Sequence, residues 1–280
     1  MLLLGSLVAI RFYLSNTSAT PSADTGTIWL SLIDNLISGL FASILIGATL
    51  YFFRPRRTSA GNIFHLNANE IVPNFDLALG SASRWTFLGN RGRYLRSKVL
   101  PKLAARGGSS PVEVVLLDPC IANICQSFID YKSSSKRMSS DEGLWTAERV
   151  QAEIVATIVV CAWYAKNPHL TVSLYLAPVF SPIRMDSDTS TMFLTAENKR
   201  EPAIAFKAPH FYSDWLMHHF AVIKRQSRQV ALPSIAAQAL VQLSNRDVEA
   251  ACTSIGLVSP SAQLIGAALQ MAKANVDPYA

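Results

Sequence analysis

The chain has 280 residues, which is room for a membrane segment and one folded domain of ordinary size. Half of the residues are hydrophobic and only 16% are charged, whereas soluble domains carry about a quarter of charged residues. This is not the composition of an ordinary soluble domain, and it fits a chain that gives part of its length to lipid. The net charge of +6 favours anionic partners, although basic residues beside a membrane would account for part of it.

The sequence predicts a membrane-spanning helix at about residues 28–53. No charged residue occurs between Asn35 and Phe53, and this stretch is long enough to cross about 30 Å of hydrocarbon. Aromatic residues stand at both ends, with Trp29 at one end and Tyr51 to Phe53 at the other, as is typical of membrane interfaces. A buried core helix is the alternative interpretation.

Three arginines, Arg54, Arg56 and Arg57, follow the predicted span directly. Because basic residues concentrate on the cytoplasmic side of membranes, we expect the rest of the chain to lie in the cytoplasm, anchored to the inner (cytoplasmic) membrane. Residues 1–14 form a shorter apolar run without the basic start or the cleavage site of a signal peptide. We interpret this run as a first span that forms a hairpin with the second, and a single span is the alternative.

The remaining chain is predicted to fold as an α/β domain with a mixed sheet. After a polar linker at 58–69, helices separate the early strands and are long enough for parallel crossovers, which favours a layered fold. Strands are expected at 85–88, 112–117, 170–177, about 183–195 and 203–207, and helices at 92–106, 146–167 and 210–229. The predicted organisation is therefore a membrane anchor at 1–57, the α/β domain at 58–230, and a small helical appendage at 231–280. Ser259 and Pro260 are the expected start of a helix in that appendage.

Three stretches of sequence resemble a known family. WTFLGNRGRYLRSKVLPKLA, which begins at Trp85, and VEVVLLDP, which begins at Val112, resemble the first strand, helix and second strand of phospholipase D-like domains. More closely, they resemble membrane-anchored bacterial proteins built on half of that fold. SLYLAPVFSPIRMDSDTSTMFLT, which begins at Ser173, lies where that superfamily carries its catalytic strand pair. The resemblance covers about residues 85–230 and implies a phospholipase D-like domain there.

The catalytic motif of that superfamily is missing from the chain. Its active members carry His-x-Lys-x-x-x-x-Asp, in which the histidine attacks phosphorus and the lysine holds a phosphate oxygen. No His-x-Lys occurs in this sequence, and Pro182, Ile183 and Arg184 stand at the corresponding place, followed by Asp186 and Asp188. Active members also pair two such motifs, whereas this chain has room for one. The resemblance therefore implies a pseudoenzyme, without phosphodiesterase activity by that mechanism.

The sequence GNRGR, from Gly89 to Arg93, predicts an anion site where the first strand of the family resemblance meets its helix. Cations at a helix N-terminus oppose the helix dipole, and a bound anion would reverse that cost. Asp118 ends an apolar strand, where ligands bind in open α/β sheets, although it serves equally well as a helix cap. A solvated basic helix is the alternative for the arginines. The predicted ligand-binding residues are Asn90, Arg91, Arg93, Arg96, Asp118, Arg184 and Asp186.

Neither a metal nor a cofactor is predicted. The four cysteines form no CxxC pair and are interpreted as reduced and buried, not as a disulfide framework or a zinc site. His210, Asp214 and His218 share one helical face, but no further ligand is fixed beside them by the sequence. The motifs GxSxG, HExxH, Walker A and GxGxxG do not occur, which excludes the standard hydrolase, protease, kinase and dehydrogenase interpretations.

These observations predict a membrane-anchored cytoplasmic domain that binds a phosphate-bearing ligand or a partner protein, with a sensing, signalling or effector role. The expected partners are the lipid bilayer, an anionic small ligand such as a nucleotide or a lipid head group, and a protein that docks on residues 231–280. Nucleic acid is not expected as a partner. Two alternatives stay open: a phosphodiesterase or lipid-acting enzyme at the inner leaflet, and a scaffold that recruits a partner through the C-terminal helices.

Overall fold

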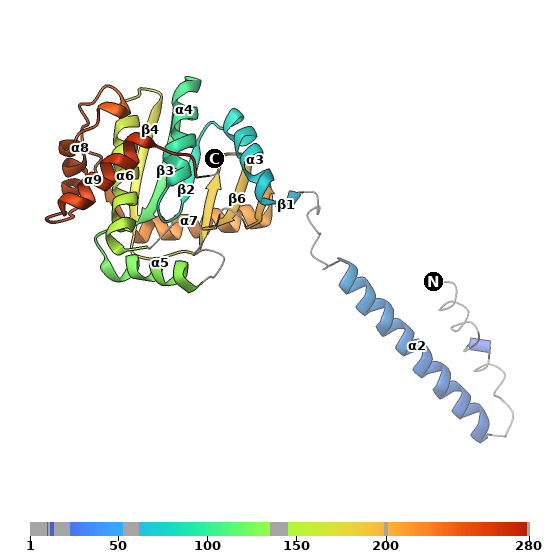
Figure 1. Cartoon of the computed structure of the whole chain (residues 1–280). Coiled ribbons are helices and arrows are strands. Elements are labelled where there is room, and N and C mark those ends of the chain that lie inside the picture. The colour runs from blue at the N-terminus through green and yellow to red at the C-terminus, as the bar shows by residue number, and fades with distance from the viewer. Residues whose placement is uncertain are drawn as a thin grey trace. The chain divides into compact units, whose positions relative to one another are not determined.

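The computed structural model describes residues 10, 12–13, 23–52, 62–134, 145–198 and 201–278. The chain divides into two compact units, Met1–Arg57 and Thr58–Ala280 (Figure 1). In the first unit, helix α2 (Ala23–Phe52) contains the stretch Ser31–Thr49, which is long and apolar enough to cross a membrane. The stretch meets the criteria of length and hydropathy for a membrane span, and a signal sequence or the core helix of a soluble protein meets the same criteria. The predicted first span and Arg54 to Arg57 lie almost wholly outside the described residues.

The second unit is built on a mixed eight-stranded sheet in the order β1-β7-β6-β5-β2-β3-β4-β8. The neighbours β2, β3 and β4 are parallel, and the remaining pairs are antiparallel. This confirms the predicted α/β class with a mixed sheet. The strands are β1 (Ile63–Leu66), β2 (Trp85–Leu88), β3 (Ser110–Leu117), β4 (Leu170–Ala177), β5 (Ile183–Ser187), β6 (Thr191–Ala196), β7 (Ala203–Lys207) and β8 (Arg228–Val230).

Helices cover both faces of this sheet (Figure 1). One face carries α3 (Ala68–Ser81), the π-helical turn η2 (Leu95–Val99) with α4 (Leu100–Arg106), α5 (Ala122–Ser134) and α6 (Ala147–Tyr164). The other face carries α7 (Phe211–Gln226). The chain then continues through the short helix η3 (Leu240–Gln242), α8 (Asn245–Ser254) and α9 (Ala262–Ala274).

The apolar run of β3 follows from these two layers. Val112, Val114 and Leu116 join the large hydrophobic cluster beneath α6, whereas Val115 joins the smaller cluster beneath α7. Successive side chains of a strand point to opposite faces, so a strand covered on both sides is apolar at nearly every position. The near-continuous apolar sequence that predicted this strand is therefore a consequence of its central place in the sheet.

The structure corrects the sequence prediction at several elements. The predicted polar linker at 58–69 contains β1 and the start of α3, where Asn67 and Glu70 form a capping box. The single strand expected at about 183–195 is a hairpin of β5 and β6, because the Asp188 carboxylate accepts hydrogen bonds from the backbone N–H groups of Ser190 and Thr191 and turns the chain. The prediction also missed α5 and β8. Cys120 is exposed in the loop after β3, so the prediction of four buried cysteines is wrong there.

Residues 231–280 belong to the same compact unit as the sheet, so the domain boundary predicted at residue 230 is not present. Helix α9 packs on the outer side of α6 and contributes Leu264, Ala268 and Ala272 to the large hydrophobic cluster. Its N-cap is Ser261, whose hydroxyl accepts from the backbone N–H of Leu264, two residues later than predicted. The tail is thus a third layer of the domain.

Replacement of Ala268 by Asp should therefore destabilise the whole domain. Ala268 is fully buried against α6, and an unpaired carboxylate there should lower the free energy of unfolding by about 3 kcal/mol or more. The control Gln270→Asp, on the exposed side of the same helix, should cost less than about 1 kcal/mol. Urea denaturation of the full chain in detergent, followed by tryptophan fluorescence, measures both. Equal and small effects would show that the tail is a separate appendage after all.

Candidate functional site

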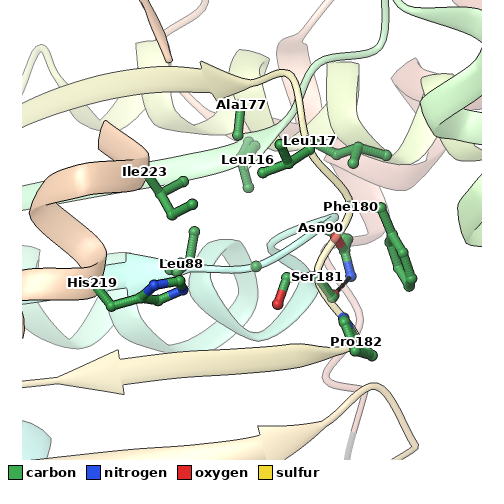
Figure 2. A pocket seen from close by; sticks show the side chains of 12 residues that line it. Leu88, Asn90, Leu116, Leu117, Ala177, Phe180, Ser181, Pro182, His219 and Ile223 are labelled. Carbon is green, nitrogen blue, oxygen red and sulfur yellow. Dashed lines mark hydrogen bonds between the residues drawn. The ribbon is translucent and has the colours of Figure 1, made fainter. Parts of the chain in front are cut away.

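The three parallel strands β2, β3 and β4 end side by side, and a cavity of about 160 Å³ lies at their carboxyl ends. Leu88, Leu117 and Ala177 are the last residues of these strands and line the cavity. Figure 2 shows the loop that leads to β5 on one side of it, and His219 and Ile223 of α7 on another. This is the edge at which ligands bind in open α/β sheets.

The lining of the cavity is apolar apart from three side chains. Ser181 donates its hydroxyl to the carbonyl of Ile183 at 2.8 Å. Asn90 donates its amide to the carbonyl of Ser181 at 2.7 Å and to Oε1 of Glu197 at 2.8 Å. The third polar side chain is the exposed imidazole of His219. Ligand pockets typically measure about 300–1,000 Å³, and a cavity of about 150 Å³ holds one benzene ring, so this cavity has room for one ring-sized group.

The predicted arginine cluster lies next to this edge, but it is directed into the protein. Arg91 is 6% exposed and bridges two carboxylates, with Nη1 3.1 Å from Oε2 of Glu153 and Nη2 3.1 Å from Oε2 of Glu197. Its guanidinium carbon also lies 4.5 Å from the ring centroid of Trp145 and 4.9 Å from that of Phe128. The aromatic faces attract the cation and complete its enclosure.

Arg96 is buried on the same side of the sheet. Its Nη1 donates to the hydroxyl of Thr157 at 2.8 Å and to the carbonyl of Glu153 at 3.3 Å. The hydroxyl of Thr157 in turn donates to the carbonyl of Arg91. Gly92, at φ +69°, permits this contact, because a Cβ there would meet Thr157 at 2.7 Å.

The arginines therefore share an anion, but this anion is a carboxylate of the protein. Arg91 binds Glu153 directly, and Nε of the half-buried Arg93 lies 3.8 Å from the same carboxylate. An external phosphate at this helix start would have to displace Glu153 from two guanidinium groups. The predicted anion site is occupied within the fold, although binding of a ligand there stays a prediction.

Electrostatics in the cluster follow from burial and pairing. Burial raises the pKa of Glu197, but Arg91, Lys132 and the hydrogen bond from Asn90 lower it by more, so the net pKa lies below the ordinary value of 4.5. Burial lowers the pKa of Arg96 to about 10, and Glu153 opposes that shift. Glu197 and Arg96 are therefore both charged at neutral pH. Removal of the partner of either group would leave its buried charge uncompensated.

Arg184 and Asp186, two of the predicted ligand-binding residues, bind each other. Nε of Arg184 donates to Oδ2 of Asp186 at 2.7 Å, and the indole of Trp85 donates to Oδ1 at 3.3 Å. Burial raises the pKa of Asp186, against the opposing effect of Arg184. A side chain at Gly89, which lines the cavity, would meet Arg184 at 2.9 Å. Neither Arg184 nor Asp186 lines the cavity itself.

Asp118 does not line the cavity, because its carboxylate is engaged in contacts that hold the fold together. Its carboxylate accepts from the backbone N–H of Cys120 and from Nε and Nη2 of Arg228, at 3.0, 2.6 and 3.0 Å. Arg228 also donates to the carbonyl of Ile255, so this contact ties β3 and β8 to the end of α8. The role of Asp118 is therefore structural, but it is not the helix cap expected as the alternative, because Cys120 precedes α5.

His210, Asp214 and His218 do not form a cluster of metal ligands. His210 is buried at the N-cap of α7, where its Nδ1 accepts from the backbone N–H of Tyr212. Asp214 and His218 are exposed further along the helix. No group of three or more potential ligands converges within the part of the chain that the structure describes.

The sequence matches no protein-family model and no curated protein. Among solved structures, one match is described as TrmBL2, an archaeal chromatin protein with a novel mode of DNA binding. The two chains are 12% identical, and the alignment covers 70% of this chain and 64% of that one, with a TM-score of 0.33. This chain thus spans less than two thirds of that protein. At so low a TM-score, the likeness carries no argument about fold or function.

The match nevertheless corrects one expectation. Nucleic acid was not expected as a partner, whereas the matching protein binds DNA by its description. The exclusion of nucleic acid is therefore contradicted and is withdrawn. The similarity assigns no DNA-binding residue to this chain.

Replacement of Arg91 by Ala should be strongly destabilising, because it leaves Glu153 and Glu197 buried without their shared cation. We expect a loss of about 3–5 kcal/mol in the free energy of unfolding. The control Arg93→Ala removes a side chain that is 26% exposed and lies 3.8 Å from Glu153, and it should cost less than about 1 kcal/mol. Denaturant titration measures both. If both variants lose little stability, and inorganic phosphate stabilises the wild type but not Arg91→Ala, Arg91 belongs to a site for an external anion instead.

The lowered pKa of Glu197 predicts a specific acid sensitivity. A carboxylate whose pKa is depressed by folding stabilises the folded state above its ordinary pKa, and this contribution is lost as the pH falls through the folded value. The free energy of unfolding should therefore fall as the pH drops below 4.5, and Glu197→Gln should weaken that dependence. The control Glu249→Gln, at an exposed position on α8, should keep the wild-type slope. Identical slopes for all three proteins would contradict the assignment.

Proposed function

We propose that the chain is a membrane-anchored binding protein whose cytoplasmic domain is a catalytically degenerate phospholipase D-like fold. The missing His-x-Lys motif supports the loss of catalysis, and the strand order, with a parallel β2-β3-β4 core beside the β5-β6 hairpin, is compatible with that fold. Helix α2 supplies a span of sufficient length and hydropathy for the anchor. A binding role in sensing, signalling or an effector function follows from this combination.

The observation that carries the proposal is the cavity at the carboxyl ends of the parallel strands. Its described lining contains no lysine or arginine, and its polar groups are Asn90, Ser181 and His219. A phosphate group would find no cation there, and the nearby arginines already bind carboxylates of the protein. We therefore propose a ligand with an apolar group the size of one ring and a single polar group that reaches the rim.

The enzyme alternative receives less support from the same residues. A nucleophile needs a base within hydrogen-bond distance, usually one that a third group orients. The hydroxyl of Ser181 donates to a backbone carbonyl, and no hydrogen bond joins it to His219 across the described cavity. Arg184 and Asp186 neutralise each other. This arrangement positions a ligand and offers no activated nucleophile.

A bulky residue at the mouth of the cavity should block binding without unfolding the domain. Val179 lines the cavity and is 40% exposed, so Val179→Trp should fill the opening while leaving the core intact. The control Val258→Trp lies outside the cavity lining, at a position that is 85% exposed. In a thermal-shift screen of small aromatic acids, amides and alcohols on the full chain in detergent, compounds that stabilise the wild type and Val258→Trp should lose their effect on Val179→Trp. If no compound distinguishes the two variants, the cavity is not the binding site.

A further inference from the structure

Helix α7 exposes a row of aromatic side chains that its packing on the sheet leaves uncovered. Leu216 and Phe220 are buried against the strands, whereas Phe211, Tyr212 and Trp215 are 67, 48 and 58% exposed. We call these last three residues the aromatic face of α7. The rings of Phe211 and Tyr212 contact each other, with 5.5 Å between their centroids. Three large aromatic side chains clustered in water indicate a surface that is covered in the functional state.

Chain connectivity places this face close to the point where the domain is tethered. Strand β1 is the first strand after the candidate span, and it forms the edge of the sheet next to β7. Phe211 begins α7 four residues after Lys207, the last residue of β7. Ten residues, 53–62, separate the end of α2 from β1, and even fully extended they span only about 35 Å. The aromatic face therefore begins beside the strand through which the tether enters.

The chemistry of the surface fits a lipid interface. Tryptophan and tyrosine are the residues enriched at the boundary between head groups and acyl chains, because each has an apolar ring and a polar group. Exposed cations stand at both ends of α7, Lys207 just before it and Arg225 in its last turn. Asp214 is the one carboxylate of the helix. Anionic phospholipid head groups attract such cations by about 1 kcal/mol each.

We propose that the aromatic face of α7 docks on the bilayer that anchors the chain, at the level of the phospholipid head groups. This inference rests on the proposed membrane anchor, because the short tether is what holds the face near lipid. The docked domain has two attachments to the membrane, the span of α2 and the side chains of Phe211, Tyr212 and Trp215. A second protein molecule on this face is the competing occupant.

Trp215 gives a direct readout of the docking. The full chain would be reconstituted, at about one copy per vesicle, into vesicles of phosphatidylcholine and phosphatidylglycerol with plain or brominated acyl chains. Bromine quenches tryptophan only within the bilayer, and Trp29 of the predicted span is present in both proteins, so the wild type should be quenched more strongly than Trp215→Phe, and the difference reports on Trp215. Phe211→Ser with Tyr212→Ser should also reduce the quenching of Trp215, whereas Val258→Ser, at a distant exposed position, should leave it unchanged. Acrylamide, an aqueous quencher, should quench the wild type in vesicles no more than Trp215→Phe, because a docked Trp215 is shielded from water.

The outcomes separate the docking from the anchor. Vesicle flotation after a carbonate wash tests the anchor first, and a chain that is washed off overturns both proposals. For a chain that floats, equal bromine quenching of the wild type and Trp215→Phe overturns the docking alone. If Trp215 is then also shielded from acrylamide, a protein occupant covers the face. If it is freely quenched by acrylamide, the face is open to water.

Discussion

The guanidinium of Arg91 is held between Glu153 of α6 and Glu197 of the loop after β6, and the arrangement of the domain around it depends on this contact. The chain segments that supply the three residues are 62 and 106 positions apart in sequence. Buried charges are stable only when each is paired and hydrogen-bonded. The contact therefore fixes the loop after β2 against α6 on one side and against the β6-β7 connection on the other, and Thr157 and Arg96 extend it along α6.

The same contact explains why the sequence predicts an anion beside the arginine-rich loop but does not identify that anion. The sequence GNRGR indicates a junction of strand and helix with an unusual need for an anion, and this need is real. The partners are distant residues, and no local pattern places Glu153 or Glu197 beside Arg91. One signal was available: Glu153 is a lone acid in the apolar centre of α6 and is 4% exposed in its side chain. A carboxylate in such a helix requires a buried cation, and Arg91 and Arg96 were the candidates.

The sequence predicted the strands best where one physical signal dominates. Residues 170–177 and 203–207 agree with β4 and β7, because each is a short stretch rich in apolar residues between polar or turn residues. Where signals conflict, the prediction failed: Pro73 interrupts the apolar pattern of α3, whose capping box at Asn67 and Glu70 points to a helix. The place of the tail could not be predicted, because two of the three buried residues of α9 are alanines, which are equally typical of a solvent-exposed helix. The cavity could not be predicted either, because its walls come from β2, β3, β4 and α7, which are brought together only by the order of the strands in the sheet.

Helix α7 belongs to both of the surfaces to which a role is proposed. Its Ile223 and His219 form one wall of the cavity (Figure 2). Its Trp215 is part of the aromatic face. Trp215 and His219 lie one turn apart with their rings stacked at 6.5 Å between centroids. A ligand that contacts His219 and a lipid surface that contacts Trp215 therefore act on the same turn of one helix. Linkage between two binding sites is reciprocal. If docking on lipid changes the affinity of the cavity for its ligand, the ligand must change the affinity of the aromatic face for lipid by the same factor. In the proposed arrangement the membrane would be one of two ligands of the domain, and the proposed anchor would set the local concentration of lipid.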